Sequence, residues 1–228
     1  MKVSVLFLVL CLSVAGNSVF AQIQNVDGLG GTVVREQKYK NVEGTPFLFP
    51  TYKAAKVFDR SGGSKSVFAK YDSYKEEVEV HNDGNPIILD AKVYGAVLFD
   101  FIDEIDNSRV RLLFKNGYNI EGFRSTDYFQ VIKDEGRYKF LKKVKTNRID
   151  SKETSYGGTN DVSSRFVQKR TYFIIDGENV TTFKKVSKST ILKMFGDTES
   201  DAVYLKKNKN KLKTEFDVIS FLAYKESN

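Results

Sequence analysis

The sequence predicts an α+β fold: a mainly antiparallel β-sheet, as a curled sheet or partial barrel of hairpins, followed by two or three short C-terminal α-helices. Between Thr51 and Lys185, short runs of valine, isoleucine, phenylalanine and tyrosine alternate with Asn-Gly and Asp-Gly pairs. This alternation is typical of antiparallel hairpins. From Ser187 onward the apolar residues recur with helical spacing. Strands first and helices last favour helices that pack on the sheet.

The first 21 residues are typical of a secretory signal peptide. Lys2 is the positive charge, the run from Val3 to Ala15 is apolar, and small residues precede a cleavage site between Ala21 and Gln22. The apolar run is shorter than the roughly 20 residues that a membrane-spanning helix requires. We therefore expect an exported chain in the periplasm or outside the cell, with association with the outer membrane as a further option.

Cleavage would remove Cys11, the only cysteine, and leave His81 as the only histidine. Lipoprotein processing at Cys11 is the weaker alternative, because Leu10 stands where a small residue is required. Thiol nucleophiles and Cys/His zinc sites are thereby excluded from the mature chain. His81 lies at the end of a strand-like segment, so a surface histidine is a simpler interpretation than a catalytic base. No later segment is apolar enough to cross a bilayer as a helix.

The chain is basic, with 36 Lys and Arg against 29 Asp and Glu. A positive balance favours anionic partners such as lipid headgroups, polysaccharide or nucleic acid. Lysines crowd the segment from Lys206 to Lys213. Export makes nucleic acid the least favoured partner, and a solvated lysine surface is the alternative.

The strand region contains five turn signals and two nearly continuous apolar runs. The turn signals are Ser61-Gly62-Gly63, Asn82-Asp83-Gly84-Asn85-Pro86, Asn116-Gly117, Asp134-Glu135-Gly136 and Asp176-Gly177. The apolar runs, Val93 to Phe101 and Tyr172 to Ile175, predict strands that are buried on both faces.

The strand that starts at Tyr138 carries candidate surface residues. Its side chains alternate between an apolar face and a cationic face, as in a strand with one face in water. Lys139, Lys143 and Lys145 on the cationic face are candidate contacts for a ligand or partner.

Two segments are expected to be irregular. Residues 145–164 contain one aliphatic residue before their final valine and should form a long exposed loop in the β domain, which spans residues 45–185. Loops of this length are uncommon unless they are functional, so Tyr156 and Gly157 join the candidate surface. Residues 22–44 are glycine-rich and are expected to be a flexible N-terminal arm.

Residues 186–228 should form the helical segment that packs on the sheet. Ser187 can cap a first helix that ends at Gly196, and a second helix is expected from about Thr198 to Lys207. The run from Thr214 to Asp217 resembles a capping box. The expected buried face of this third helix consists of Phe216, Ile219, Leu222 and Ala223.

No pattern predicts a cofactor or metal site. The acidic run from Asp100 to Asp106 lacks the alternating spacing of a calcium loop. The glycines at Gly28, Gly30 and Gly31 are not followed by the residues of a phosphate-binding loop. No single pair of carboxylates is distinguished as a catalytic acid and base.

Several motifs between Gly44 and the end of the chain combine packing and turn residues. They are Gly44-Thr45-Pro46-Phe47-Leu48, Tyr71-Asp72-Ser73-Tyr74, Asn85-Pro86-Ile87-Ile88-Leu89, Gly122-Phe123, Tyr128-Phe129-Gln130-Val131, Tyr156-Gly157, Arg165-Phe166 and Leu212-Lys213-Thr214-Glu215-Phe216-Asp217. Together they resemble a group of exported β-rich Bacteroidota proteins of unassigned function. The resemblance implies the architecture and the exported location, and it transfers no activity.

Three functional hypotheses follow. In the first, the chain is a non-enzymatic protein of the cell envelope that binds an apolar or anionic ligand, either lipid or glycan. An interior apolar cavity that holds an acyl chain would favour it. In the second, the chain is a structural or interaction protein that contacts other envelope proteins through a sheet edge or residues 145–164. A carboxylate-dependent hydrolase is the third.

Overall fold

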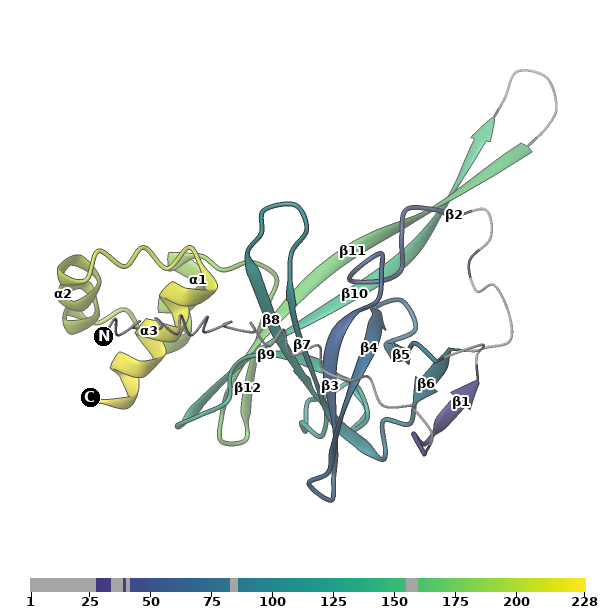
Figure 1. The fold of residues 1–228 in the computed structure, drawn as a ribbon. Coiled ribbons are helices and arrows are strands. Elements are labelled where there is room, and N and C mark those ends of the chain that lie inside the picture. Colours follow the sequence, from purple (N-terminus) through teal and green to yellow (C-terminus); the bar gives the residue numbers. More distant parts are fainter. Residues whose placement is uncertain (1–27, 34–38, 40–41, 83–85, 155–159) are drawn as a thin grey trace, which may run out of the picture.

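A computed structural model describes residues 28–33, 39, 42–82, 86–154 and 160–228 of the chain, without the side chains of 151–154 and 160–163. These residues form one open sheet of twelve strands followed by three helices (Figure 1). The strands are mainly antiparallel, and the sheet does not close on itself. The predicted α+β fold with C-terminal helices is confirmed.

The strands differ widely in length. They are β1 (Gly31–Val33), β2 (Val42–Glu43), β3 (Lys53–Asp59), β4 (Ser64–Asp72), β5 (Glu77–Val80), β6 (Ile87–Leu89), β7 (Tyr94–Ile102), β8 (Arg109–Lys115), β9 (Phe129–Lys133), β10 (Tyr138–Thr154), β11 (Asn160–Asp176) and β12 (Asn179–Phe183). Their order across the sheet is β1-β6-β5-β4-β3-β7-β8-β9-β10-β11-β12, and β2 pairs with β11 in parallel.

Three of the five turn signals join consecutive antiparallel strands, as predicted. Ser61-Gly62-Gly63 joins β3 to β4, Asp134-Glu135-Gly136 joins β9 to β10, and Asp176-Gly177 joins β11 to β12. The signal at 82–86 falls in part on residues 83–85, which lie outside the described residues.

Asn116-Gly117 does not form a hairpin turn, because residues 116–128 separate β8 from β9. The Asn116 side chain is buried, and its amide donates to the carbonyl oxygens of Ala91 and Tyr94. The role of Asn116 is therefore to make these long-range hydrogen bonds rather than to form a hairpin turn.

The expected long loop at 145–164 is wrong, because β10 and β11 pair without interruption from Tyr138 and Asp176 to Thr154 and Asn160. Figure 1 shows the distal part of this ribbon projecting away from the remaining strands. Beyond Thr146, the described side chains of Arg148, Ile149 and Asp150 in β10 are exposed, so this stretch lacks the apolar alternation that marks a half-buried strand. Tyr156 and Gly157 lie outside the described residues.

The expectation of a flexible arm over 22–44 is also wrong for part of its length. β1 pairs with β6, and β2 pairs with β11. Both strands are very short, so no periodicity could identify them.

Burial on both faces holds for one of the two apolar runs. Tyr172, Phe173 and Ile174 in β11 are all buried, in agreement with the prediction. In β7 the buried side chains include Val97 and Phe99, whereas the other face is only half-buried.

The three helices are α1 (Lys188–Phe195), α2 (Glu199–Lys207) and α3 (Glu215–Glu226). Ser187, Thr198 and Thr214 cap them as predicted, and the last two form capping boxes with Asp201 and Asp217.

The expected buried face of the third helix is wrong in part. Val218, Phe221 and Leu222 are fully buried, whereas Phe216 is 75 % exposed. Residues three and four apart share a helix face, and Phe216 stands only two residues before Val218, so it projects to another side.

Three groups of buried side chains form the core. The first lies within the curled part made by β1 and β3–β8 and includes Val57, Tyr71, Val97, Phe99 and Phe114. The second packs the helices on β10–β12 and includes Phe140, Tyr172, Phe183, Ile191 and Phe221. The third consists of Ile120, Phe129, Leu141 and Phe173, with neighbouring half-buried residues. Since Phe140 and Leu141 point to opposite faces of β10, this strand is covered on both sides.

Asp201→Asn should lower the free energy of unfolding by about 2 kcal/mol at pH 7, because Asp201 is fully buried and its carboxylate lies 3.1 Å from the Lys225 ammonium. Burial alone would raise the pKa of Asp201, but hydrogen bonds from Lys225 and Thr198 hold it below its usual value. A group with a lowered folded pKa stabilises above its unfolded pKa and loses that contribution as the pH falls through the folded pKa.

Urea unfolding at pH 7 and at pH 3 should therefore show a smaller difference between wild type and variant at the lower pH. The control Asp197→Asn removes an exposed carboxylate from the connection between α1 and α2. It should change the free energy of unfolding by less than about 0.5 kcal/mol. A difference for Asp201→Asn that is the same at both pH values would contradict the ion pair.

Candidate functional site

The three candidate lysines of β10 do not form a common cationic surface. Lys143 is 3 % exposed, and its ammonium lies 2.9 Å from Glu76 Oε1 and donates to the Tyr128 carbonyl oxygen. Lys139 is half-buried, with its ammonium 5.8 Å from the centre of the Tyr118 ring. Only Lys145 is well exposed. Residues from other segments, including Glu76 and Phe129, cover this side of β10, so that Lys143 lies in the interior. The sequence of one strand cannot reveal such a covering layer.

The buried Lys143 ammonium is held by one carboxylate and two aromatic rings. Its ammonium lies 4.9 Å from the Phe129 ring centre and 5.7 Å from that of Phe123. Burial lowers the pKa of Lys143, and the attraction of Glu76 opposes that shift. An ammonium in this position is therefore stabilised by local partners rather than by water.

The turn between β4 and β5 positions Glu76. Its backbone is in the left-handed region, with φ of 64°. Asp72 Oδ1 accepts hydrogen bonds from the amides of Tyr74 and Lys75, which fixes the turn. The Tyr71 hydroxyl is buried nearby, and burial raises its pKa well above the usual value, with a further contribution from Glu76.

A polar pocket of about 390 Å³ lies beside this ion pair. Its lining includes Glu76, Arg124, Thr126 and Tyr128. Arg124 is itself paired with Asp127 at 2.8 Å. The pocket is polar and zwitterionic, unlike the apolar cavity that an acyl chain would require.

Among the described residues, no group of three or more histidine, cysteine, aspartate or glutamate side chains is arranged to hold a metal ion. His81 is exposed, with its ring beside that of Tyr52. The cleavage residues Ala21 and Gln22 lie outside the described part of the chain.

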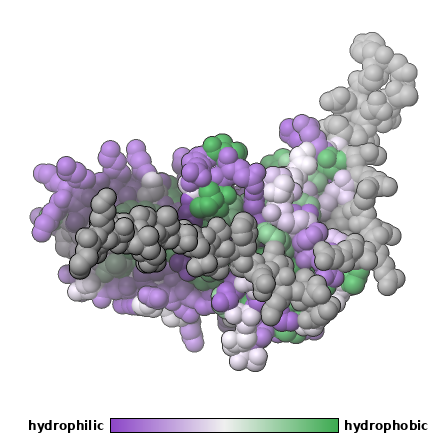
Figure 2. Space-filling view, viewed as in Figure 1, coloured by the Kyte–Doolittle hydropathy of each residue, from purple (hydrophilic) through white to green (hydrophobic). Residues whose placement is uncertain are grey.

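A second candidate site is the basic layer, a set of nine exposed lysines between β12 and α3. It consists of Lys184, Lys185, Lys188, Lys193, Lys206, Lys207, Lys209, Lys211 and Lys213. Within the described residues, none of them has a carboxylate within 4.0 Å, whereas ion pairs are frequent elsewhere. Figure 2 shows that the helical end of the molecule is covered largely with hydrophilic residues.

Three acidic side chains of the helical end are engaged in ion pairs with lysines outside the basic layer. Asp201 binds Lys225, Glu215 lies 2.9 Å from Lys142, and Glu226 lies 2.8 Å from Lys133. These pairs join the helices to each other or to the sheet. The positive charge of the basic layer is consequently left for solvent or for a partner.

Residues 206–213, which we term the basic loop, are held in a defined conformation. Leu212 is fully buried, and its amide donates to Asn210 Oδ1, while the Asn210 side chain donates to the Asp217 carbonyl oxygen. Lys209 and Leu212 both have φ in the left-handed region, at 52° and 51°. Since side chains other than glycine rarely adopt this region, the buried leucine and the asparagine bonds must maintain it. Along the loop, exposed lysines therefore alternate with Asn210 and Leu212, whose side chains are turned toward the protein.

Two large apolar side chains are exposed close to the basic loop in the sequence. Phe216 in α3 is 75 % exposed, and Val203 in α2 is 61 % exposed. The lysine cluster was visible in the sequence. The exposure of Phe216 was not, because it depends on which side of α3 meets the sheet.

No protein-family model matches this chain, and no curated protein or solved structure matches it significantly. The resemblance to exported Bacteroidota proteins stays a prediction. In the described residues, no helix is long and apolar enough to cross a membrane.

Lys143→Met should lower the free energy of unfolding by about 3 to 5 kcal/mol, because it leaves the Glu76 carboxylate buried without its closest cation. Lys145→Met is the matched control. Its ammonium is 3.9 Å from Glu76 and its side chain is 53 % exposed, so the loss should stay below about 1 kcal/mol.

The double variant Lys143→Met/Glu76→Gln should recover part of the stability, because it removes the buried charge. Chemical denaturation of the wild type, Lys143→Met, Glu76→Gln, the double variant and the Lys145→Met control gives the comparison. The ion-pair account would fail if the double variant were as unstable as the sum of the two single variants.

Proposed function

We propose that this chain is a non-enzymatic, exported protein of the cell envelope that binds anionic lipid headgroups through its basic loop. The observation that supports this most is the presence of five exposed lysines, Lys206, Lys207, Lys209, Lys211 and Lys213, without a carboxylate partner among the described residues. Each lysine near an anionic bilayer contributes about 1 kcal/mol to binding.

The conformation of the loop adds to this electrostatic attraction. Because Leu212 and Asn210 fix the backbone, little conformational entropy is lost when the lysines meet a surface. Preorganisation of this kind strengthens binding without any further contact.

Phe216 favours a bilayer over a soluble glycan. Lipid headgroups and acidic polysaccharides both present negative charge, but only a bilayer offers an apolar phase for an exposed aromatic ring. Phe216 comes three residues after Lys213, at the start of α3, where the ring can enter the headgroup region while the lysines stay at the surface.

The interior of the molecule supports a surface ligand rather than an enclosed acyl chain. Fully buried aromatic side chains, including Tyr71, Phe99 and Phe114, occupy the curled part of the sheet. In the polar pocket the Glu76 carboxylate is already paired with Lys143, which argues against its use as a hydrolase acid or base.

Replacing Lys209, Lys211 and Lys213 together by glutamine should weaken binding to phosphatidylglycerol vesicles about 100-fold at low salt, since three contributions of about 1 kcal/mol are lost. Vesicle co-sedimentation measures the change. The control replaces Lys56, Lys92 and Lys169, three exposed lysines of the sheet and its connections, and should leave binding nearly unchanged. Equal losses for the two triple variants would mean that net charge alone is responsible.

Phe216→Ala should weaken binding to the same vesicles about tenfold and leave binding to a soluble polyanion, such as dextran sulfate, unchanged. Ile105→Ala is the control, because Ile105 is 96 % exposed in the turn between β7 and β8 and lies outside the basic loop. If Phe216→Ala had no effect on vesicles while the lysine variant lost both partners, a glycan would replace lipid as the ligand.

A further inference from the structure

The last strand of the sheet, β12, has one open edge. It pairs with β11 on one side, and the strand order ends there, so no described strand covers its other side. Backbone N–H and C=O groups of alternating residues point outward along such an edge.

The β12 edge lacks three of the features that prevent strand addition, namely charged side chains, proline and a bulge. Its sequence, NVTTF, contains no lysine and no proline, and its register with β11 runs without a bulge from Asn179 to Phe183. Exposed edges without charge, proline or a bulge are templates for pairing with another chain.

A groove of about 460 Å³ runs beside this edge, between β12 and α1. It is lined by Thr181, Thr182, Ser189, Thr190, Lys193 and Met194. The four α1 residues are spaced one, four and five positions from the first, so they occupy one side of the helix. A strand added to β12 would therefore have α1 beside it, with Met194 as an apolar contact and hydroxyl groups around it.

The positive charge in and beside the groove favours an acidic binding partner. Lys193 lines it, and Lys184, Lys185 and Lys188 lie in the short connection between β12 and α1 or at the start of α1. No acidic side chain is among the lining residues. An added strand with carboxylates would meet complementary charge, whereas a second copy of β12 would bring a second set of lysines to the same place.

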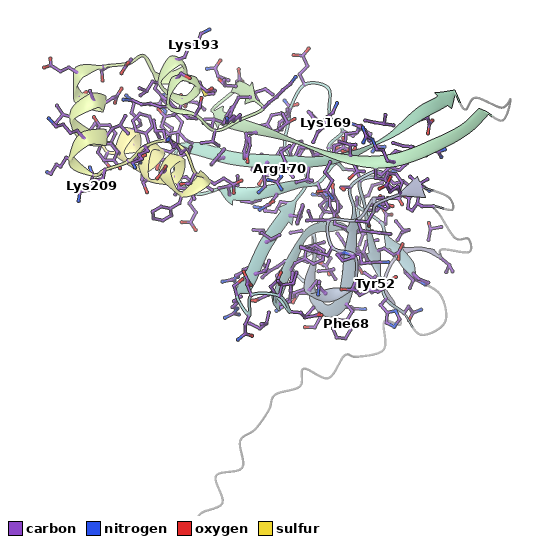
Figure 3. All side chains as sticks on the ribbon, turned by 90° about the horizontal axis from the view of Figure 1, so that it is seen from above. Tyr52, Phe68, Lys169, Arg170, Lys193 and Lys209 are labelled. Carbon is purple, nitrogen blue, oxygen red and sulfur yellow. The ribbon has the colours of Figure 1, made fainter. Side chains whose placement is uncertain are left out.

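We infer that the β12 edge binds an extended acidic segment of another protein as an additional strand. About five residues suffice to pair along the length of β12, through main-chain hydrogen bonds to Val180 and Thr182 and side-chain contacts in the groove. This binding site goes beyond the proposed lipid contact and does not depend on it. Figure 3 shows Lys193 and Lys209 far apart on the helical end.

The test selects peptides that bind the full chain from a random heptapeptide library displayed on phage. The expected result is enrichment of peptides that carry acidic residues among β-branched ones. Thr182→Pro removes an edge N–H and should abolish their binding, whereas Thr182→Val keeps the N–H and should bind normally. Fluorescence polarisation with an enriched peptide gives the affinities.

Charge reversal supplies an independent readout that does not require a change to the strand. Lys193→Glu should weaken peptide binding at least tenfold, and the control Lys209→Glu should not. A library that yields no peptide, peptides without acidic residues, or peptides that bind equally well to Thr182→Pro would overturn the inference. A dimer of the wild-type chain that Thr182→Pro converts to a monomer would instead assign the edge to a second copy and also overturn it.

Discussion

The structure depends on one constraint: β10 must be covered on both faces although one of its covered side chains is a lysine. Phe140 faces the helices, and Leu141 faces the opposite layer. Two residues further along that second face, Lys143 enters the interior and meets Glu76 from the β4–β5 turn. Because an unpaired buried ammonium is strongly unfavourable, the curled part of the sheet must keep Glu76 in place. The ion pair thereby links the curled part to the strands that hold the helices.

The use of carboxylates in ion pairs also explains the positive charge of the helical end. Asp201, Glu215 and Glu226 each bind a lysine that joins α2 or α3 to its neighbours. Once these groups are engaged, few acidic side chains are left to balance the lysines between Lys184 and Lys213. The surface that we propose as the lipid-binding site is thus a consequence of how the helices are attached. β12 is the last strand in the order of the sheet, so no described strand pairs with its outer edge.

Local patterns predicted much of this fold. Helix caps at Ser187, Thr198 and Thr214 and the turn at Asp176-Gly177 were readable because they depend on neighbouring residues. Features that depend on contacts between distant parts of the chain could not be predicted from the sequence. Arg148, Ile149 and Asp150 of β10 are all exposed, so no apolar alternation marks this stretch as a strand.

The candidate site shows the same division. The sequence revealed the crowded lysines of the basic loop, but the interior position of Lys143 and the outward position of Phe216 follow from layers that pack across the chain. The open edge of β12 could not be foreseen either, because strand order is a property of the assembled sheet.

Hydrogen–deuterium exchange of the full chain, with and without phosphatidylglycerol vesicles, tests the central claim most directly. The account predicts slower exchange on lipid in residues 206–216 and unchanged exchange in β3, β4, β7 and β8. Protection confined to the sheet, or no protection anywhere at saturating lipid, would contradict it.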